Sequence, residues 1–267
     1  MTDSNRAPAA VSRDDWAAQI AALDGTPTRS RKTPISIDRI VAASFDIVAA
    51  EGFDALTMRR VAAALGTGPA SLYAHVRNKA RLDDLLIAVL CSRVRLPTPD
   101  SGRWSIQFID VCRQLRDQYL RFPGISRATL AAAPTSLETL RISEGMLAIL
   151  LAGEVSPQAA AWAVDAALLY VAAYSLEASL RRDPATDTDG RILDRTERIE
   201  RFRMLPAARF PNVVAYAPEL TAGDGHERFD FTLDLLLRGL ASREQRDTPE
   251  VIDSAIIDPS GHERSTP

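Results

Sequence analysis

The sequence has few of the residues from which catalytic and metal sites are usually built. Its 267 residues include only two cysteines and three histidines, which make neither a disulfide framework nor a zinc set. Cys91 and Cys112 both lie in apolar helical patterns, which favours buried thiols over redox sensors. The chain shows no glycine-rich phosphate loop and no pairing of a nucleophile with a base. We therefore predict no metal, no cofactor and no enzymatic activity.

Long apolar segments are also scarce. No basic-then-apolar signal segment opens the sequence, and the longest apolar run, residues 159–176, is interrupted by Asp165. A run of that length that consists mostly of alanine is marginal for a membrane span, and a buried helix explains it better. We therefore expect a cytoplasmic protein with no membrane partner.

Lysine is rare, and the charge is unevenly placed. Lys32 and Lys79 are the two lysines among 32 basic residues, and the formal net charge is −3. Residues 29–83 hold nine Arg or Lys and five Asp or Glu, a local excess of +4, so the rest of the chain carries −7. A basic segment attached to an acidic remainder suits binding to chosen DNA sites better than indiscriminate coating.

Helical patterns account for nearly the whole chain, and no strand pattern or internal repeat competes with them. Apolar residues at helical spacing predict the following helices: 36–50, 57–65, 70–76, 78–95, 104–121, 125–132, 135–151, 156–181, 192–205 and 224–242. Thr135 and Glu138 form a predicted capping box. We predict a polar loop at 183–190 and a long irregular connection at 206–224, which contains three prolines.

This pattern predicts an all-α fold with four segments. An N-terminal three-helix helix-turn-helix domain (35–80) precedes a C-terminal helical ligand-binding and dimerisation domain (81–242). A flexible N-terminal extension with a basic arm (1–34) and a disordered tail (243–267) flank them. The basic arm is either a solvated linker or a strand of chain that follows the phosphate backbone or the minor groove.

Two short helical patterns around the turn Gly66-Thr67-Gly68 form the most informative stretch. Helix, tight turn and helix is the geometry that places a second helix in a DNA major groove. Leu72 and Val76 are predicted to point inward. Ala70, Ser71 and Ala74 then point outward, and their small size lets the backbone approach base edges closely.

The same stretch resembles the TetR family of bacterial transcriptional repressors. The resemblance rests on the order Leu56-Thr57-x-Arg59, Ala62, Leu65-Gly66, Ser71-Leu72-Tyr73-x-His75-Val76 and Asn78-Lys79. It covers residues 35–89 at motif level, and the later helices match the family in number, length and order. Gly68, Pro69 and Ala74 depart from the larger side chains of the tetracycline-responsive branch, so we expect a different operator sequence.

The resemblance implies a set of DNA-contacting residues. They are Thr57, Arg59, Thr67, Pro69, Ala70, Ser71, Tyr73, His75 and Lys79. Arg59 is expected to reach a guanine or a phosphate, and the residues that open the second helix are expected to line the major groove. Tyr73, His75 and Lys79 are expected to hold phosphates, which fixes register without reading sequence. A core aromatic at Tyr73 and an ordinary surface histidine at His75 remain alternatives.

We expect a homodimeric repressor that binds a palindromic double-stranded DNA operator and is released by a small apolar or aromatic effector. Helices 156–181 and 224–242 are too apolar to face solvent on every side, so they are predicted to pair across a two-fold axis. The candidate ligand-binding residues are Trp104, Phe108, Tyr119, Met146, Trp162, Tyr170 and Tyr174. A helix-turn-helix activator, a ligand-independent regulator and a protein-binding scaffold are the alternatives.

Overall fold

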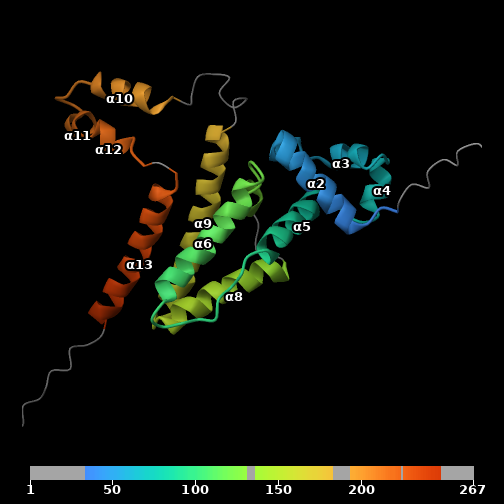
Figure 1. Cartoon of the computed structure of the whole chain (residues 1–267), viewed down its shortest axis with the longest axis horizontal. Helices are drawn as coiled ribbons and strands as arrows, with labels where there is room; N and C mark the ends of the chain where they lie inside the picture. Colours follow the sequence, from blue (N-terminus) through green and yellow to red (C-terminus); the bar gives the residue numbers. More distant parts are fainter. Residues whose placement is uncertain (1–33, 131–135, 183–192, 224, 248–267) are drawn as a thin grey trace, which may run out of the picture.

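The structure, a computed structural model, describes residues 34–130, 136–182, 193–223 and 225–247. Within these ranges every regular element is a helix, which confirms the predicted all-α fold (Figure 1). The predicted basic arm, the polar loop at 183–190 and the tail beyond 247 lie outside the described residues.

The first described helices form a small head. It contains α2 (Ile37–Glu51), the short 3-10 helix η1 (Phe53–Ala55), α3 (Met58–Ala64) and α4 (Pro69–Tyr73). Ser36 caps α2 as predicted by accepting the Arg39 N–H, and Gly52 ends it with a φ of 81°, a conformation that glycine adopts without strain. The core of the head is made of fully buried residues: Ile40, Val48, Val61, Leu72 and Val76.

Helix α5 (Lys79–Ser92) joins the head to the body without a linker. Asn78 caps it as predicted, and Leu82, Leu86 and Leu90 on its inner face are fully buried. It packs against α2 in the head and against α6, α7 and α8 in the body. The boundary predicted between residues 80 and 81 therefore falls inside a continuous helix. A displacement of α5 would change packing contacts in both the head and the body.

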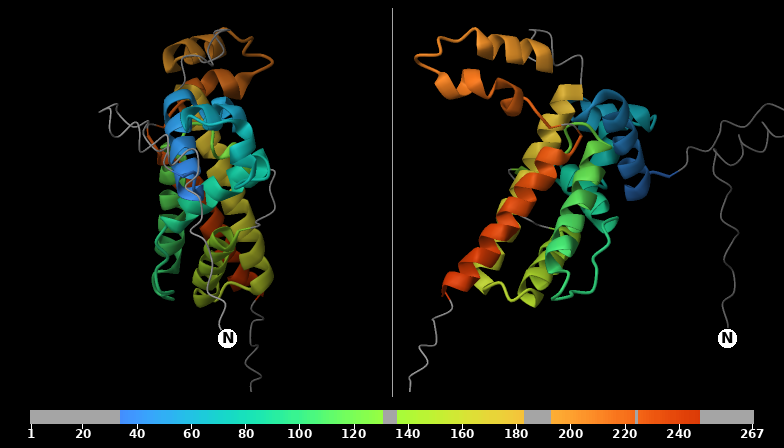
Figure 2. Two further views of the ribbon diagram at one scale, coloured as in Figure 1. Left: turned by 90° about the vertical axis from the view of Figure 1, so that its right-hand side faces the viewer. Right: turned by 60° about the vertical axis from the view of Figure 1, so that its left-hand side comes forward.

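The body is a bundle built around α6 (Trp104–Leu120). Beside it lie α7 (Arg127–Leu130), α8 (Leu137–Ala152), α9 (Pro157–Arg182) and α13 (Glu227–Asp247). Helix α6 packs against α8, α9 and α13 (Figure 2). Helix α9 is long and apolar enough to cross a membrane by length and composition alone, but 44% of its most apolar window is buried inside the protein. It is the alanine-rich helix that the sequence predicts to be buried.

A group of short helices, α10 (Arg195–Arg203), α11 (Pro211–Ala215) and α12 (Ala217–Leu220), projects beyond the ends of α9 and α13 (Figure 1). These helices pack mainly on one another. The prediction of an irregular connection at 206–224 was therefore wrong in part. Pro211 and Pro218 lie in the first turns of α11 and α12, where the missing N–H costs nothing, so they start helices instead of preventing them.

Several predicted helix ends also need correction, and three of them are informative. Ser136, not Thr135, caps α8, because its hydroxyl accepts the Thr139 N–H at 3.1 Å. Helix α4 ends at Tyr73, and α13 continues to Asp247, past the predicted start of the tail. Frayed and capped helix ends depend on single hydrogen bonds, which periodicity does not report.

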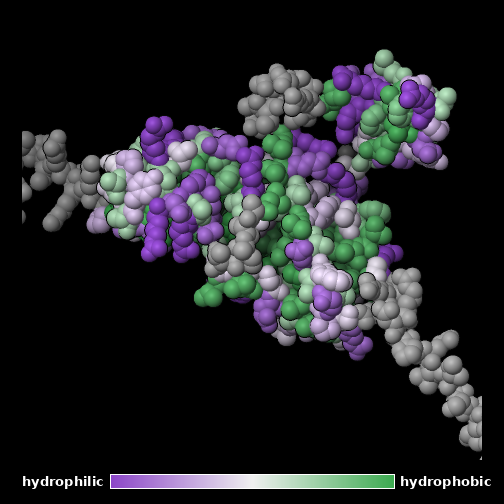
Figure 3. Space-filling model, turned by 180° about the vertical axis from the view of Figure 1, so that it is seen from behind, coloured by the Kyte–Doolittle hydropathy of each residue, from purple (hydrophilic) through white to green (hydrophobic). Residues whose placement is uncertain are grey.

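Seen from behind, the surface of the head carries many hydrophilic residues, whereas hydrophobic residues gather over the body (Figure 3). Large exposed apolar side chains on α9 and α13 include Trp162, Leu169, Phe231 and Leu235. An apolar surface of this kind marks a site of contact with another molecule.

Candidate nucleic-acid interface and ligand cavity

The turn between α3 and α4 is held by local hydrogen bonds and by the head core. Thr57 caps α3, with its hydroxyl accepting the Arg60 N–H at 3.1 Å. Gly66 turns the chain with a φ of 63°. Leu72 and Val76 are fully buried, as predicted, which leaves the opposite side of α4 open to solvent.

The predicted DNA-contacting residues lie at the surface of this motif. Those that are exposed are Thr57, Arg59, Pro69, Ala70, Ser71, Tyr73 and His75, while Thr67 is half-buried. Tyr73 is 51% exposed, which excludes the alternative of a core aromatic. The exposed surface of α4 therefore carries small side chains and one polar group, the Ser71 hydroxyl. The Tyr73 hydroxyl and the His75 imidazole lie close to the C-terminal end of the helix.

Two neighbouring arginines on α3 differ in availability. The Arg60 guanidinium bonds Glu51 of α2, with 2.5 Å between Nη2 and Oε1, and this hydrogen bond lowers the pKa of Glu51. The side chain of Arg59 is exposed and makes no hydrogen bond or ion pair with the described residues. Arg77 is equally exposed and unpaired in the described part of the chain. The set of residues predicted from the sequence does not include Arg77, although Arg77 lies between two of its members, His75 and Lys79.

Lys79 differs from the other predicted phosphate contacts, because its ammonium group already has partners. Its Nζ lies 2.5 Å from Asp83 Oδ1 and 4.2 Å from the centre of the Phe53 ring. Burial raises the pKa of Asp83 despite the opposing effect of Lys79. A contact between Lys79 and a phosphate therefore requires the ammonium group to leave Asp83.

The head meets the body at the turn between α6 and α7. The Phe53 N–H donates to the Pro123 carbonyl at 3.0 Å. The rings of Phe45 and Phe122 lie 4.5 Å apart, and the Arg127 guanidinium bonds Asp54. Phe53 thus contacts both Lys79 and this turn, so the head and the body share one small contact region.

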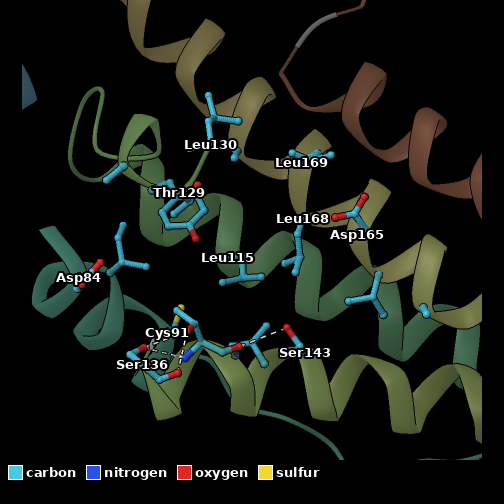
Figure 4. Close-up of a pocket in the computed structure, with 18 residues that line it drawn as sticks. Asp84, Cys91, Leu115, Thr129, Leu130, Ser136, Ser143, Asp165, Leu168 and Leu169 are labelled. Carbon is cyan, nitrogen blue, oxygen red and sulfur yellow. Dashed lines mark hydrogen bonds between the residues drawn. The ribbon is translucent and has the colours of Figure 1, made fainter. Parts of the chain in front are cut away.

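A cavity of about 550 Å³ lies beside this region, between α5, α6, α7, α8 and α9 (Figure 4). Its described lining residues are Asp84, Ile87, Cys91, Leu115, Tyr119, Ala128, Thr129, Leu130, Ser136, Thr139, Ile142, Ser143, Ala161, Val164, Asp165, Leu168, Leu169 and Ala172. A volume of this size fits a drug-sized molecule. Ala128, Thr129 and Leu130 belong to α7, directly after the Arg127 that bonds the head.

The wall is mostly apolar, with a few hydroxyl groups and the carboxylates of Asp84 and Asp165. Burial raises the pKa of the Tyr119 phenol, so its hydroxyl stays protonated and can donate to a ligand. Burial also raises the pKa of the Cys91 thiol to about 12, which leaves it protonated and a poor nucleophile at neutral pH. The cavity can therefore bind and orient a molecule, and its cysteine is unsuited to chemistry on that molecule.

Of the seven predicted ligand-binding residues, Tyr119 alone is among those that line this cavity. Phe108 and Met146 are fully buried in the core, and Trp162 is exposed on α9. Trp104 lies over Gly153, where an added Cβ would come within 2.4 Å of the indole. The positions of Phe108, Met146 and Trp104 follow from packing, since large side chains at helical spacing fill the contacts between helices.

The remaining two, Tyr170 and Tyr174, attach α13 to α9. Their rings lie 5.5 and 4.9 Å from the Phe229 ring. The Tyr174 hydroxyl lies 3.1 Å from His226 Nδ1, and Arg228 bonds Glu177. These tyrosines therefore hold the last helix in place and are not among the residues that line the cavity.

Two family models match successive parts of the chain, and the first of them ends inside α5. Residues 40–86 match the bacterial regulatory proteins of the tetR family, and residues 96–243 match the tetracyclin repressor-like C-terminal domain. The second match covers more than half of the chain. The chain belongs to the TetR family.

Individual relatives agree with this assignment. The HTH-type transcriptional repressor DrrR1 of Streptomyces coeruleorubidus is 30% identical over 225 residues, which cover 80% of each protein. The class G tetracycline repressor protein of Vibrio anguillarum is 28% identical over 209 residues, covering 78% of this chain and 94% of that protein. The structure of ActR from Streptomyces coelicolor in complex with actinorhodin has a TM-score of 0.71 at 34% identity, covering 79% of this chain and 97% of ActR.

The family assignment fixes the class of activity. This TetR-family protein is a DNA-binding transcriptional repressor with a ligand-binding C-terminal domain, and it acts as a homodimer, not as an enzyme. Its partners are double-stranded DNA and a small molecule.

Proposed function

We propose that this repressor binds a pseudo-palindromic operator in the cytoplasm and leaves it when a small apolar or aromatic molecule fills the cavity. The observation that carries this proposal is the position of the cavity. It is lined by α5 and α7, the two helices through which the body holds the head.

The DNA-binding half of the proposal rests on exposed side chains with free donors. Arg59 and Ser71 present a guanidinium and a hydroxyl without competing partners in the described part of the chain. Arginine pairs with guanine and serine with several bases, whereas Tyr73 and His75 suit phosphate oxygens. Because α4 is short and its outer face is small, DNA shape is expected to contribute to the choice of site.

The effector half rests on the cavity and on the solved relatives. Its volume suits one drug-sized molecule, and its wall is mostly apolar. The structures of ActR contain (S)-DNPA in one case and actinorhodin in another. We propose that this chain likewise accepts a small organic effector.

The contact region between head and body supplies a path from the cavity to the DNA. A ligand that displaces α7 acts on Arg127 and therefore on Asp54 in the head. The same movement acts on the Pro123 carbonyl, which holds Phe53 and, through its ring, Lys79. We propose that these contacts set the angle of the head and the freedom of Lys79 together.

The two protomers are proposed to pair through α9 and α13. Trp162 and Leu169 are seven residues apart on α9, and Phe231 and Leu235 are four apart on α13, so each pair lies on one helix face. Trp162 is 62% and Phe231 67% exposed in the single chain. Burying both faces across a two-fold axis gives a four-helix interface, as predicted from the sequence.

Release from the operator requires the effector to bind one conformational state of the dimer more tightly than the other. To move the dimer from mostly DNA-competent to mostly incompetent, the effector must prefer one state by about 5.5 kcal/mol. A drug-sized apolar ligand meets this demand when it is buried in the cavity of one state and is largely excluded from the cavity of the other.

Selection of duplexes from a randomised DNA pool by the full chain tests the DNA half of the proposal. We expect an inverted repeat bound by two protomers, with half-site centres about 34–36 Å apart, or a multiple of it, because each head enters one major groove. Enrichment of an asymmetric site bound by a single protomer would contradict it. A reporter promoter that carries the selected site then separates repression from the alternative of activation.

A further inference from the structure

The cavity contains two carboxylates without a cation to balance them. Asp84 of α5 and Asp165 of α9 both line it. Neither side-chain carboxylate makes a hydrogen bond or an ion pair within the described residues. None of the described lining residues is a lysine, arginine or histidine.

Cations near the cavity wall are already committed elsewhere. The Arg141 guanidinium donates from Nη2 to the carbonyls of Cys91 and Val94, at 2.6 and 3.1 Å. Its Nε bonds Glu138 at 2.9 Å. Lys79 bonds Asp83, the residue before Asp84. Among the described lining residues, no cationic side chain balances the two carboxylates.

The two carboxylates lie on opposite sides of the cavity, with Leu115 between them (Figure 4). Asp84 is half-buried, whereas Asp165 is exposed in the single chain. A carboxylate that faces an apolar cavity loses part of its hydration when a ligand enters, and an unpaired carboxylate would then oppose ligand binding. A positively charged group on the ligand removes this penalty and gains a charge-assisted hydrogen bond.

We propose that the effector is a cationic amphiphile, with an apolar or aromatic body that carries a protonated amine. The amine pairs with Asp84, and Asp165 adds to the attraction from the opposite wall. This inference rests on the proposed function, and it narrows the effector from any apolar molecule to one with a positive charge. It also places the charged contact on α5, next to the residue that holds Lys79.

Three probes of similar size separate the charge of the ligand from its shape. They are 9-(aminomethyl)anthracene, which is protonated at neutral pH, the neutral 9-anthracenemethanol, and the anionic 9-anthracenecarboxylic acid. Binding to the full chain is measured by fluorescence titration and by calorimetry. We expect the amine to bind at least tenfold more tightly than the alcohol, a difference of about 1.4 kcal/mol, and the acid to bind most weakly.

Substitutions then locate the charged contact. Asp84→Asn is expected to reduce the preference for the amine over the alcohol to less than threefold, and Asp165→Asn to reduce it by a smaller factor. Asp46→Asn is the matched control, since it removes one exposed carboxylate from α2, away from the cavity lining, and should leave the preference unchanged.

The outcomes distinguish this inference from the proposed function. If the alcohol or the acid binds as tightly as the amine and displaces selected operator DNA, the cavity is an effector site but the charge assignment is wrong. The assignment is also wrong if the preference for the amine survives in both cavity variants. If none of the three probes binds, both the assignment and the proposed role of the cavity are contradicted.

Discussion

Asp83→Asn should strengthen DNA binding, although Asp83 is not expected to touch DNA. The substitution removes the anion that lies 2.5 Å from the Lys79 ammonium and keeps the size of the side chain. Lys79 then no longer has to leave a carboxylate before it reaches a phosphate. Each additional phosphate contact steepens the dependence of log K on log salt by about 0.9.

The magnitude follows from counterion release. At about 0.1 M salt, one new contact raises affinity by up to about eightfold, and two contacts in a dimer raise it by up to about 60-fold. The fold should tolerate the change. Burial raises the pKa of Asp83, so its ionisation is disfavoured in the folded state. The associated stability is present below the unfolded pKa and is lost as pH rises through the raised folded pKa, so at pH 7 a neutral amide removes the desolvation penalty of a buried carboxylate.

The assay is fluorescence anisotropy with a selected duplex at four or five salt concentrations. Asp46→Asn serves as the control, because it makes the same charge change on an exposed residue of α2. If both variants give the same salt slope, the reasoning about Lys79 is refuted. The effect of Asp83→Asn should also vanish in a Lys79→Ala background, which identifies Lys79 as the group that carries it.

Three further predictions concern separate parts of the chain. Ser71→Ala should change base preference at particular positions of the selected site, as shown by repeated selection, and a uniform loss of affinity would place Ser71 outside the groove. Gly153→Ala should lower the free energy of unfolding by about 1–3 kcal/mol, because the new Cβ would lie 2.4 Å from the Trp104 ring. Gly68→Ala is the control: a Cβ there meets nothing within 4 Å, so the same denaturation assay should show a far smaller loss. Cys91 and Cys112 should resist iodoacetamide at pH 8 until the protein unfolds, since both are buried with a thiol pKa raised to about 12, and rapid labelling of the native protein by mass spectrometry would show that this burial is wrong.

The sequence was sufficient to predict most of the helices and the surface of the head. Ser36, Thr57 and Asn78 each cap the predicted helix through a side chain that accepts a backbone N–H. Residues four apart on a helix share a face, so the burial of Leu72 and Val76 could be derived from spacing alone.

The cavity and its connection to the head were not predictable in the same way. Periodicity shows which face of a helix turns inward but not which helix it meets. Phe108 and Met146 therefore proved to be core residues, whereas small or polar residues such as Ser143 and Asp165 line the cavity. The contacts of Phe53 with Pro123 and Lys79 join segments far apart in the sequence, and no local pattern announces them.

Amide hydrogen exchange with and without the selected operator tests the central claim most directly, and it needs no knowledge of the effector. If a ligand in the cavity changes the affinity of the protein for DNA, DNA binding must change the affinity of the cavity for that ligand by the same coupling free energy. We therefore predict altered exchange at residues 121–130, the turn and helix that connect the cavity to the head, and along α5, when operator is added to the full chain. Changes confined to residues 35–80 would contradict the account, because the cavity and the DNA-binding surface would then be independent.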